Sequence, residues 1–344
     1  MNPYALSVII SSLALGTTTT LSSSHWILAW VGLEINTLAI IPMMTMTPHP
    51  RAIEAATKYF LTQAAASALI LFSSILNAWL LGEWTINNLS NPVSMIFLSI
   101  ALSIKLGLAP FHFWMPDVLQ GLTLSTGWIL STWQKLAPMA VLLQLSQAVN
   151  LPLMMALGLL SALIGGWGGI NQNQIRKILA FSSIAHLGWI IAILHISPSL
   201  SILNFSLYLI MASTLFYMFI TINSTNISHL ATTWTKVPAL TALSLLSLLS
   251  LAGLPPLTGF MPKWLIAQEM IKQDLILLSF VMLTLTLLSL FFYLRLTYTI
   301  SLTMAPNSSL STSLWLLKGK NNLALLILLT LCLLPISPSL LSLI

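Results

Sequence analysis

The sequence predicts an all-α polytopic membrane protein, and three observations carry this prediction. First, 57% of the 344 residues are hydrophobic and 5% are charged, whereas soluble chains are about a quarter charged. Second, the mean hydropathy is +0.96. Third, apolar runs recur that are long enough to cross the hydrocarbon layer, which takes about 20 residues. The polar segments between these runs are too short to form a soluble domain, so we expect a single transmembrane domain over residues 1–344.

Eleven apolar runs can be separated along the chain. The first begins at the N-terminus itself, because no basic residue precedes Arg51 and a cleavable secretory signal needs a basic start. Polar, Pro- or Asn-rich segments such as 47–51 and 87–92 mark the later boundaries. The expected spans are 3–22, 25–45, 55–80, 92–121, 122–147, 150–171, 175–195, 199–222, 238–272, 276–303 and 323–343.

Two of the expected spans are interrupted. The sequence LAPFHFWMP falls inside 92–121, and LPPLTGFMP falls inside 238–272. Proline in a helix interior removes a hydrogen bond and clashes with the preceding turn. We therefore expect residues 108–116 and 254–262 to be non-helical, in opposite orientations and near the middle of the membrane. Paired broken helices in two halves are typical of inverted-repeat transporters and point to the ion path.

Loop charges predict the orientation of the chain. Basic residues follow the even-numbered spans, at Arg51, Lys58, Arg176, Lys177, Lys236, Lys318 and Lys320. The loops of the opposite side show no basic excess. Because Lys and Arg accumulate on the side from which insertion occurs, we expect the N-terminus inside. With eleven spans the C-terminus is then outside.

Composition and motifs exclude several kinds of site. The single cysteine, Cys332, excludes an internal disulfide, an Fe–S cluster and a thiolate zinc site. The run GGWGG at 165–169 lacks the spacing of a dinucleotide-binding motif and is better explained by close packing of helices through small residues. The net charge of +6 lies in short loops, where topology explains it without a nucleic-acid partner.

The main functional signal is a set of ionisable residues inside apolar runs, namely Glu34, Lys105, Lys135 and Lys263. A charged group at mid-membrane depth costs about 2.5–3.5 kcal/mol on insertion scales and marks a functional site by default. Lys135 lies about 18 Å of helix rise from either end of its expected span, which is too far for its stem to reach the interface. A pair of Glu34 with Lys105 would lower the insertion cost of both.

Together with His186, these residues are interpreted as a proton path. Burial disfavours the charged form of a lysine, so a buried lysine can exchange a proton near neutral pH, and a nearby carboxylate reverses that effect. Histidine titrates closest to physiological pH. Structural explanations also remain open. Lys135 could bind a carbonyl for packing alone, and Lys105 could snorkel. Lys263 could simply start a helix, and His186 could be a satisfied core histidine.

Four runs carry a resemblance to a known family: LSIKLGLAPFHFWMPDVLQG, WQKLAP, INQNQIRKILAFSSIAHLGW and SLAGLPPLTGFMPKW. Together they resemble the antiporter-like membrane subunits of respiratory complex I, and the resemblance covers essentially the whole chain. In that family a glutamate pairs with a lysine on the first broken helix. A central lysine follows on the next helix, and a terminal lysine lies on the second broken helix. The resemblance assigns these roles to Glu34, Lys105, Lys135 and Lys263.

The resemblance also implies an assembly and a location. The chain would have antiporter-like inverted repeats and would be a subunit of an H⁺-translocating NADH:ubiquinone reductase. It would lie in the mitochondrial inner membrane, with its N-terminus in the matrix and its C-terminus in the intermembrane space. Its partners would be other complex I subunits, especially neighbouring antiporter-like and small membrane subunits, together with lipids. No flavin, Fe–S cluster or quinone site would belong to this chain, and NADH, FMN, Fe–S clusters and ubiquinone would be bound by partner subunits.

One departure from the family pattern is visible. Bacterial relatives have fourteen helices and eleven fit here, so three are missing; Glu34 already lies in the second span, which places the loss at the N-terminus.

Two other functions remain open, namely a stand-alone cation/proton antiporter and a structural membrane spacer without transport. Na⁺ transport by the isolated chain in liposomes would favour the antiporter. Intact pumping after neutralisation of Lys135 would favour the spacer.

Overall fold

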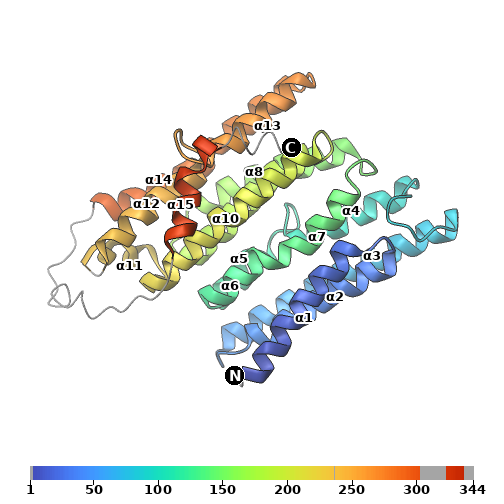
Figure 1. Cartoon of the computed structure of the whole chain (residues 1–344), viewed down its shortest axis with the longest axis horizontal. Coiled ribbons are helices and arrows are strands. Elements are labelled where there is room, and N and C mark those ends of the chain that lie inside the picture. Colours follow the sequence, from blue (N-terminus) through green and yellow to red (C-terminus); the bar gives the residue numbers. More distant parts are fainter. Residues whose placement is uncertain (1–2, 236, 303–322, 337–344) are drawn as a thin grey trace. The chain divides into compact units, whose positions relative to one another are not determined.

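The computed structural model describes residues 3–235, 237–302 and 323–336, and this part of the chain is built from helices and short connections (Figure 1). The chain divides into two compact units, Met1–Leu160 and Ser161–Ile344. The first contains α1 (Pro3–Ser22), α2 (Trp26–Met44), α3 (Pro50–Leu81), α4 (Pro92–Leu106), α5 (Trp114–Gly121), α6 (Leu124–Ser131), α7 (Trp133–Gln144) and the start of α8 (Leu151–Ile170). The second contains the rest of α8, then α9 (Ile175–Leu194), α10 (Pro198–Ile222), α11 (Ile227–Ala231), η1 (Thr232–Thr235), α12 (Pro238–Ala252), α13 (Phe260–Lys272), α14 (Ile276–Leu302), α15 (Ala324–Cys332) and η3 (Leu334–Ile336).

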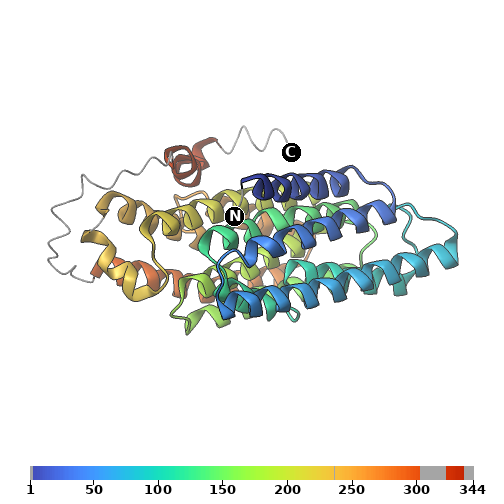
Figure 2. The ribbon, with the colours of Figure 1, turned by 90° about the horizontal axis from the view of Figure 1, so that it is seen from below.

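In the first unit, small residues bring the first two helices close together. α1 packs along α2, and α2 packs on α3 (Figures 1 and 2). A Cβ atom on Gly32 of α2 would lie 2.9 Å from the carbonyl oxygen of Gly16 of α1. Such close approach of backbones is a common packing mode in membranes. α3 also contacts both α4 and α5, so one long helix flanks both halves of the first broken helix.

The ends of α3 are set by local sequence signals. His49 precedes the helix and its Nδ1 accepts a hydrogen bond of 3.1 Å from the backbone N–H of Arg51. Pro50 occupies the first helical position, where its fixed φ and missing N–H are favourable. Gly82 ends the helix in the left-handed region at φ 73°, as glycine commonly does. The helix has 32 residues and therefore rises about 48 Å.

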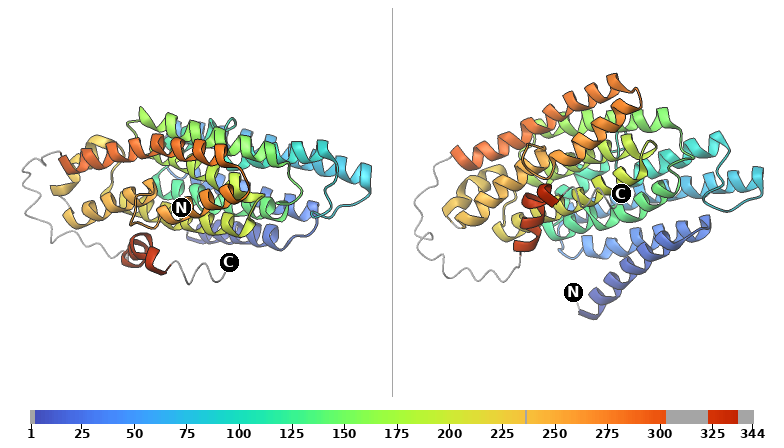
Figure 3. Two further views of the ribbon diagram at one scale, coloured as in Figure 1. Left: turned by 90° about the horizontal axis from the view of Figure 1, so that it is seen from above. Right: turned by 45° about the horizontal axis from the view of Figure 1, so that its top comes forward.

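In the second unit, α9 packs on α10, and α12 contacts α10, α14 and α15. The C-terminal part of α8 runs beside α14 (Figure 3). A Cβ atom on Gly166 would lie 2.8 Å from Leu288 Cβ, and one on Gly169 would lie 2.7 Å from the Phe292 ring. The GGWGG run therefore makes the close helix contact that the sequence predicts.

One arginine fastens the end of α8 to α14. Arg295 donates from Nη1 to the carbonyl oxygen of Ile170, the last residue of α8, at 2.6 Å. Its Nη2 donates to Asn173 Oδ1 at 2.8 Å. The guanidinium satisfies a helix-end carbonyl that has no partner within its own helix.

Both predicted interruptions are present, but they are shorter than expected. The predicted non-helical ranges, 108–116 and 254–262, are wrong at their C-terminal ends because α5 and α13 already begin at Trp114 and Phe260. In both cases the proline of the Met-Pro pair occupies the third helical position. The first turn of a helix tolerates proline, because the N–H groups there have no helical acceptor.

The expected span 122–147 is not one continuous helix, because it divides into α6 and α7 at Thr132. Thr132 has φ −113° and ψ −69°, and its Oγ1 donates a hydrogen bond of 2.7 Å to the carbonyl oxygen of Trp128. Such bonding back to the preceding turn often bends helices. Within the last expected span, 323–343, α15 ends at Cys332. Residues 337–343 and the loop 306–322 lie outside the described residues.

The all-helical membrane fold is confirmed, and the count of eleven spans stays a prediction. In the described ranges, seven helices are individually long and apolar enough to cross a membrane: α1, α2, α3, α8, α9, α10 and α14. The other expected crossings consist of shorter pieces, namely α4 with α5, α6 with α7, α12 with α13, and α15. The prediction of a single membrane domain likewise stays a prediction.

Candidate functional site

A small cavity in the first unit brings Lys105 and Lys135 together. Its volume is about 20 Å³, which is enough for one water molecule, since a water needs about 10–15 Å³. Only 5% of Lys105 and 3% of Lys135 is exposed. The other lining residues are Leu33, Asn36, Thr37, Tyr59, Gln63, Leu106, Trp114, Leu130, Gln134, Ala137 and Pro138.

The ends of two helices position these lysines. Lys105 lies in the last turn of α4, which Gly107 closes at φ 76°, a conformation that side chains with a Cβ rarely adopt. Lys135 lies in the first turn of α7, directly after the interruption that separates it from α6. Pro138 has no N–H, so the carbonyl of Gln134 lacks its usual helical donor.

Glu34 lies half-buried on α2 at the edge of this cavity. Thr37, which lines the cavity, has its Oγ1 2.9 Å from both a carboxylate oxygen and the backbone carbonyl oxygen of Glu34, so its hydroxyl can donate to either. Among the described residues no ion pair joins Glu34 directly to Lys105, so the direct pair expected from the sequence is not formed. The negative charge of Glu34 nevertheless acts on both Lys105 and Tyr59. Glu34 is thus connected to the cavity through Thr37.

Three amide residues in the cavity wall were not singled out from the sequence: Asn36, Gln63 and Gln134. Gln134 Nε2 donates to the carbonyl oxygen of Asn36 at 3.0 Å and thereby ties α7 to α2. Within the described residues, both polar side-chain atoms of Asn36, Nε2 of Gln63 and Nζ of Lys105 are buried without a hydrogen-bond partner. Buried polar groups are normally satisfied by protein or water, so these atoms suit a hydrated site. Their sequence signal, an amide inside an apolar run, is weaker than that of a charge.

A second cavity, in the second unit, brings His186 and Lys263 together. Its volume is about 10 Å³, at the lower limit of what one water needs. His186 on α9 is 7% exposed, and Lys263 in the first turn of α13 is partly buried. The other lining residues are Ala162, Ala185, Trp189, Leu285, Thr286 and Ser289.

Lys263 connects the two halves of the second broken helix. Its Nζ donates a hydrogen bond of 2.8 Å to the carbonyl oxygen of Ala252, the last residue of α12. A cation is favoured at this end of a helix by the helix dipole. Gly253 follows at φ 83°, and a Cβ atom there would lie 2.8 Å from Lys263 Nζ. The glycine therefore makes the space in which the lysine end lies.

Two buried tyrosines near His186 were also missed by the sequence analysis. The Tyr208 ring lies 5.7 Å from the His186 ring, and its hydroxyl has Ser183 as a hydrogen-bonding neighbour. Tyr293 acts electrostatically on Tyr208 and has Ser182 beside its hydroxyl. Tyrosine in an apolar run gives no distinct signal, because it also serves as ordinary apolar packing.

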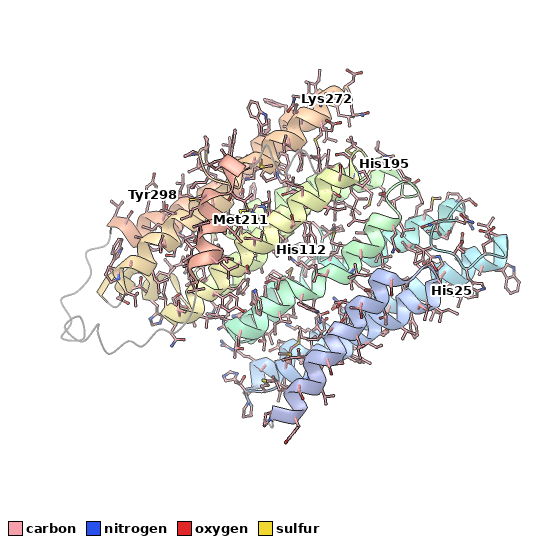
Figure 4. The ribbon with its side chains drawn as sticks, viewed as in Figure 1. His25, His112, His195, Met211, Lys272 and Tyr298 are labelled. Carbon is pink, nitrogen blue, oxygen red and sulfur yellow. The ribbon has the colours of Figure 1, made fainter. Side chains whose placement is uncertain are left out.

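The remaining histidines are arranged as their positions in the sequence suggest. Figure 4 shows His112 between α4 and α5, away from the helix ends at which His25 and His195 lie. In the described part of the chain, no group of three or more His, Cys, Asp or Glu residues could hold a metal ion. Each lysine cavity, in contrast, combines two titratable side chains with a volume close to that of one water. This arrangement suits the transfer of a proton.

The chain matches two family profiles. The one described as NADH:quinone oxidoreductase/Mrp antiporter, TM, covers residues 23–289. The one described as NADH dehydrogenase subunit 2 C-terminus covers residues 290–341. Together they account for nearly all of the chain beyond α1.

Curated relatives and solved structures agree with this assignment. NADH-ubiquinone oxidoreductase chain 2 of Aquarana catesbeiana is 60% identical over 343 residues, covering 99% of each chain. The same protein of Xenopus laevis is 61% identical over 341 residues, covering 98% of this chain and 99% of its own. A chain of respiratory complex I from Thermus thermophilus with bound aureothin has a TM-score of 0.79 at 26% identity, covering 97% of this chain and 80% of that one. A chain of the Mrp complex from Dietzia sp. DQ12-45-1b has a TM-score of 0.84 at 17% identity, covering 97% and 75%, which shows a shared fold.

Proposed function

The chain belongs to the membrane-subunit family of NADH:quinone oxidoreductases and Mrp antiporters, and we propose that it translocates protons as a core membrane subunit of respiratory complex I. The family membership agrees with the resemblance found in the sequence. One observation carries the proposal, namely that Lys105 and Lys135 line the same buried cavity. Two buried amines that line one cavity have no packing advantage over apolar side chains, because burial disfavours the charged form of each amine.

In the first unit, each residue has a separate part in the proposed transfer. Glu34 supplies the counter-charge for Lys105 when that lysine carries the proton. Lys105 then passes that proton through the cavity to Lys135, so that one amine is neutral whenever the other is charged. The hydrogen bond from Thr37 fixes the Glu34 carboxylate next to the cavity. Gln134 holds α7 against α2 and thereby keeps Lys135 in place.

In the second unit, His186 receives the proton and Lys263 holds it at the far end of the path. Their shared cavity supports this step, and Lys263 is free to exchange its carbonyl partner at Ala252 for water. The step from Lys135 to His186 joins the two units and rests on the family resemblance. All five residues of the proposed path, Glu34, Lys105, Lys135, His186 and Lys263, were selected from the sequence.

The proposal extends to cofactors, location and orientation. The redox cofactors, NADH, FMN, Fe–S clusters and ubiquinone, are bound by partner subunits. A single cysteine in this chain supports that part of the proposal, because Fe–S clusters are usually held by four. The partners are other complex I subunits, including neighbouring antiporter-like and small membrane subunits, together with lipids. The chain lies in the mitochondrial inner membrane, with its N-terminus in the matrix and its C-terminus in the intermembrane space, as the loop charges indicate.

The test is proton transport by the assembled complex carrying Lys135→Ala. We expect coupled proton transport through this subunit to fall by roughly 10²-fold, the low end of the effect of removing a general acid or base. The complex would be reconstituted in vesicles, with NADH oxidation and proton uptake followed together. Lys272→Ala is the matched control, because Lys272 is exposed and forms a surface ion pair with Glu269 at 3.1 Å. Unchanged pumping in Lys135→Ala, with assembly confirmed on native gels, would support a structural spacer instead.

A further inference from the structure

A polar pocket lies on the surface of the first unit, where α3 packs on α5. Its volume is about 170 Å³, and it is lined by Arg51, Glu54, Ala55, Lys58, Asp117, Gln120 and Gly121. It contains two of the six acidic residues of the whole chain. A polar pocket with both signs of charge is therefore unusual on this apolar protein.

Lys58 is the centre of this pocket. Its Nζ lies 2.9 Å from Glu54 Oε1 and 3.0 Å from Asp117 Oδ2. All three side chains are substantially exposed, and exposed ion pairs add at most about 1 kcal/mol of stability. The cluster is thus poorly explained as a stabilising contact. It is well suited to exchange protons with water, because both carboxylates are exposed.

The two helices that form the pocket also form the wall of the lysine cavity. Tyr59 directly follows Lys58 on α3, and Gln63 lies about 7.5 Å from Lys58 along the helix axis. Both line the cavity that holds Lys105, as does Trp114 on α5. Gln63 Nε2 and Lys105 Nζ are the buried atoms without a hydrogen-bond partner described above. On the cavity side, these helices therefore lie beside buried polar atoms without hydrogen-bond partners. On the surface side, they form the charged pocket.

An aromatic pair from these two helices lies in the wall of the lysine cavity. The rings of Tyr59 and Trp114 lie 5.7 Å apart at 61°, and both residues are buried. Trp114 Nε1 donates a hydrogen bond of 3.0 Å to the carbonyl oxygen of Ile104, which fixes the indole one residue from Lys105. Tyr59 brings a hydroxyl to the same cavity wall as the Trp114 indole. Glu34 acts electrostatically on this tyrosine as well as on Lys105.

We propose that the pocket around Lys58 is the proton entrance of the first unit and that Tyr59 carries the proton past Trp114 to the lysine cavity. The proposal rests on the proposed function above. A proton from water first binds the carboxylate of Asp117. The Tyr59 oxygen then accepts a proton from the pocket side and releases its own hydrogen to the cavity side, where the neutral amine of Lys105 takes it. One proton enters and one leaves, so the tyrosine returns to its neutral state after the hydroxyl turns back.

The test uses the assembled complex in vesicles, with Asp117→Asn and Tyr59→Phe compared in separate preparations. Neutralising Asp117 should slow proton uptake at least about tenfold, the low end of the effect of charge on capture rates. Asp117→Glu should restore it. Tyr59→Phe keeps the ring but removes the hydroxyl, so it should slow uptake without changing assembly. If Asp117→Asn prevents assembly, Glu54→Gln probes the same pocket.

Matched controls come from the second unit. Glu269→Gln breaks the Glu269–Lys272 ion pair of 3.1 Å, which is comparable to the Lys58 pair but belongs to neither cavity. Tyr298→Phe removes the hydroxyl of an exposed tyrosine. Both controls should pump normally. If Lys135→Ala stops pumping but Asp117→Asn and Tyr59→Phe pump normally, the entrance is elsewhere and the proposed function stands. If Lys135→Ala also pumps normally, both proposals are wrong.

Discussion

Lys263 reaches back across the second break and donates a 2.8 Å hydrogen bond from Nζ to the carbonyl oxygen of Ala252. The lysine therefore caps the C-terminus of α12 although it belongs to α13. This contact couples the state of the amine to the geometry of the break, because a neutral amine loses the attraction of the helix dipole for a cation. A proton held at Lys263 should therefore stabilise the hydrogen bond to Ala252, and this hydrogen bond should in turn favour the protonated amine.

Gly253→Ala should disable this contact. The new methyl group would lie 2.8 Å from Lys263 Nζ and would displace the amine. An alanine at φ 83° also costs about 1–2 kcal/mol of folding free energy. We expect both a lower unfolding temperature and a loss of proton transport, measured on the purified complex and on vesicles respectively.

Gly82→Ala separates these two effects. Gly82 has φ 73°, but nothing lies within 4 Å of its hypothetical Cβ atom. The control should therefore lose a similar amount of stability and keep its transport rate. Equal transport in the two variants would show that the Lys263 contact has no part in the path.

Thr37→Val tests the connection of Glu34 to the lysine cavity. Valine has nearly the shape of threonine but cannot donate the 2.9 Å hydrogen bond to the Glu34 carboxylate. Hydrogen bonds to charged groups contribute about 1.5–3 kcal/mol, so the carboxylate should change position or partner and coupled turnover should fall. Thr37→Ser retains the donor and should transport normally. If the valine variant matches the serine variant in vesicle assays, Glu34 does not act through Thr37.

Cysteine labelling tests the orientation at the two ends of α3. In a Cys332→Ser background, a cysteine at Thr47 should react from the matrix side, and one at Asn87 from the intermembrane side, because the basic residues Arg51 and Lys58 follow Thr47. Both positions are exposed, and they lie beyond opposite ends of the helix. An impermeant reagent added to mitoplasts, which lack the outer membrane but keep an intact inner membrane, distinguishes the two. Labelling of position 47 alone would reverse the proposed topology.

The breaks and the lysines could be predicted because their causes are local. Proline excludes a regular helix wherever it stands in an interior, and a charge in an apolar run is costly whatever surrounds it. The division at Thr132 could not be predicted in this way, because threonine hydroxyls bond back to the preceding turn at Thr132 and in unbroken helices alike. Threonine stands in many intact helices, including four times in succession in α1.

The cavity wall could not be predicted from the sequence, because it is assembled from helices that are distant in the chain. Asn36, Gln63 and Gln134 come from α2, α3 and α7, and only the packing of these helices brings the amides together. The position of Glu34 has the same origin. Its depth in α2 indicated a buried partner, and a lysine was the natural candidate on charge alone, but the helix places the carboxylate against Thr37.

The length of α3 gives the complex a dependence on the lipids around it. A helix that rises about 48 Å exceeds a hydrocarbon layer of about 30 Å by roughly 18 Å, so its N-terminal turns, which include Lys58, lie near the headgroups. Hydrophobic mismatch makes such a helix tilt or the bilayer adapt. In vesicles of longer acyl chains the ion pair between Lys58 and Asp117 would be drawn toward the hydrocarbon and away from water. Proton uptake should therefore decline with acyl-chain length.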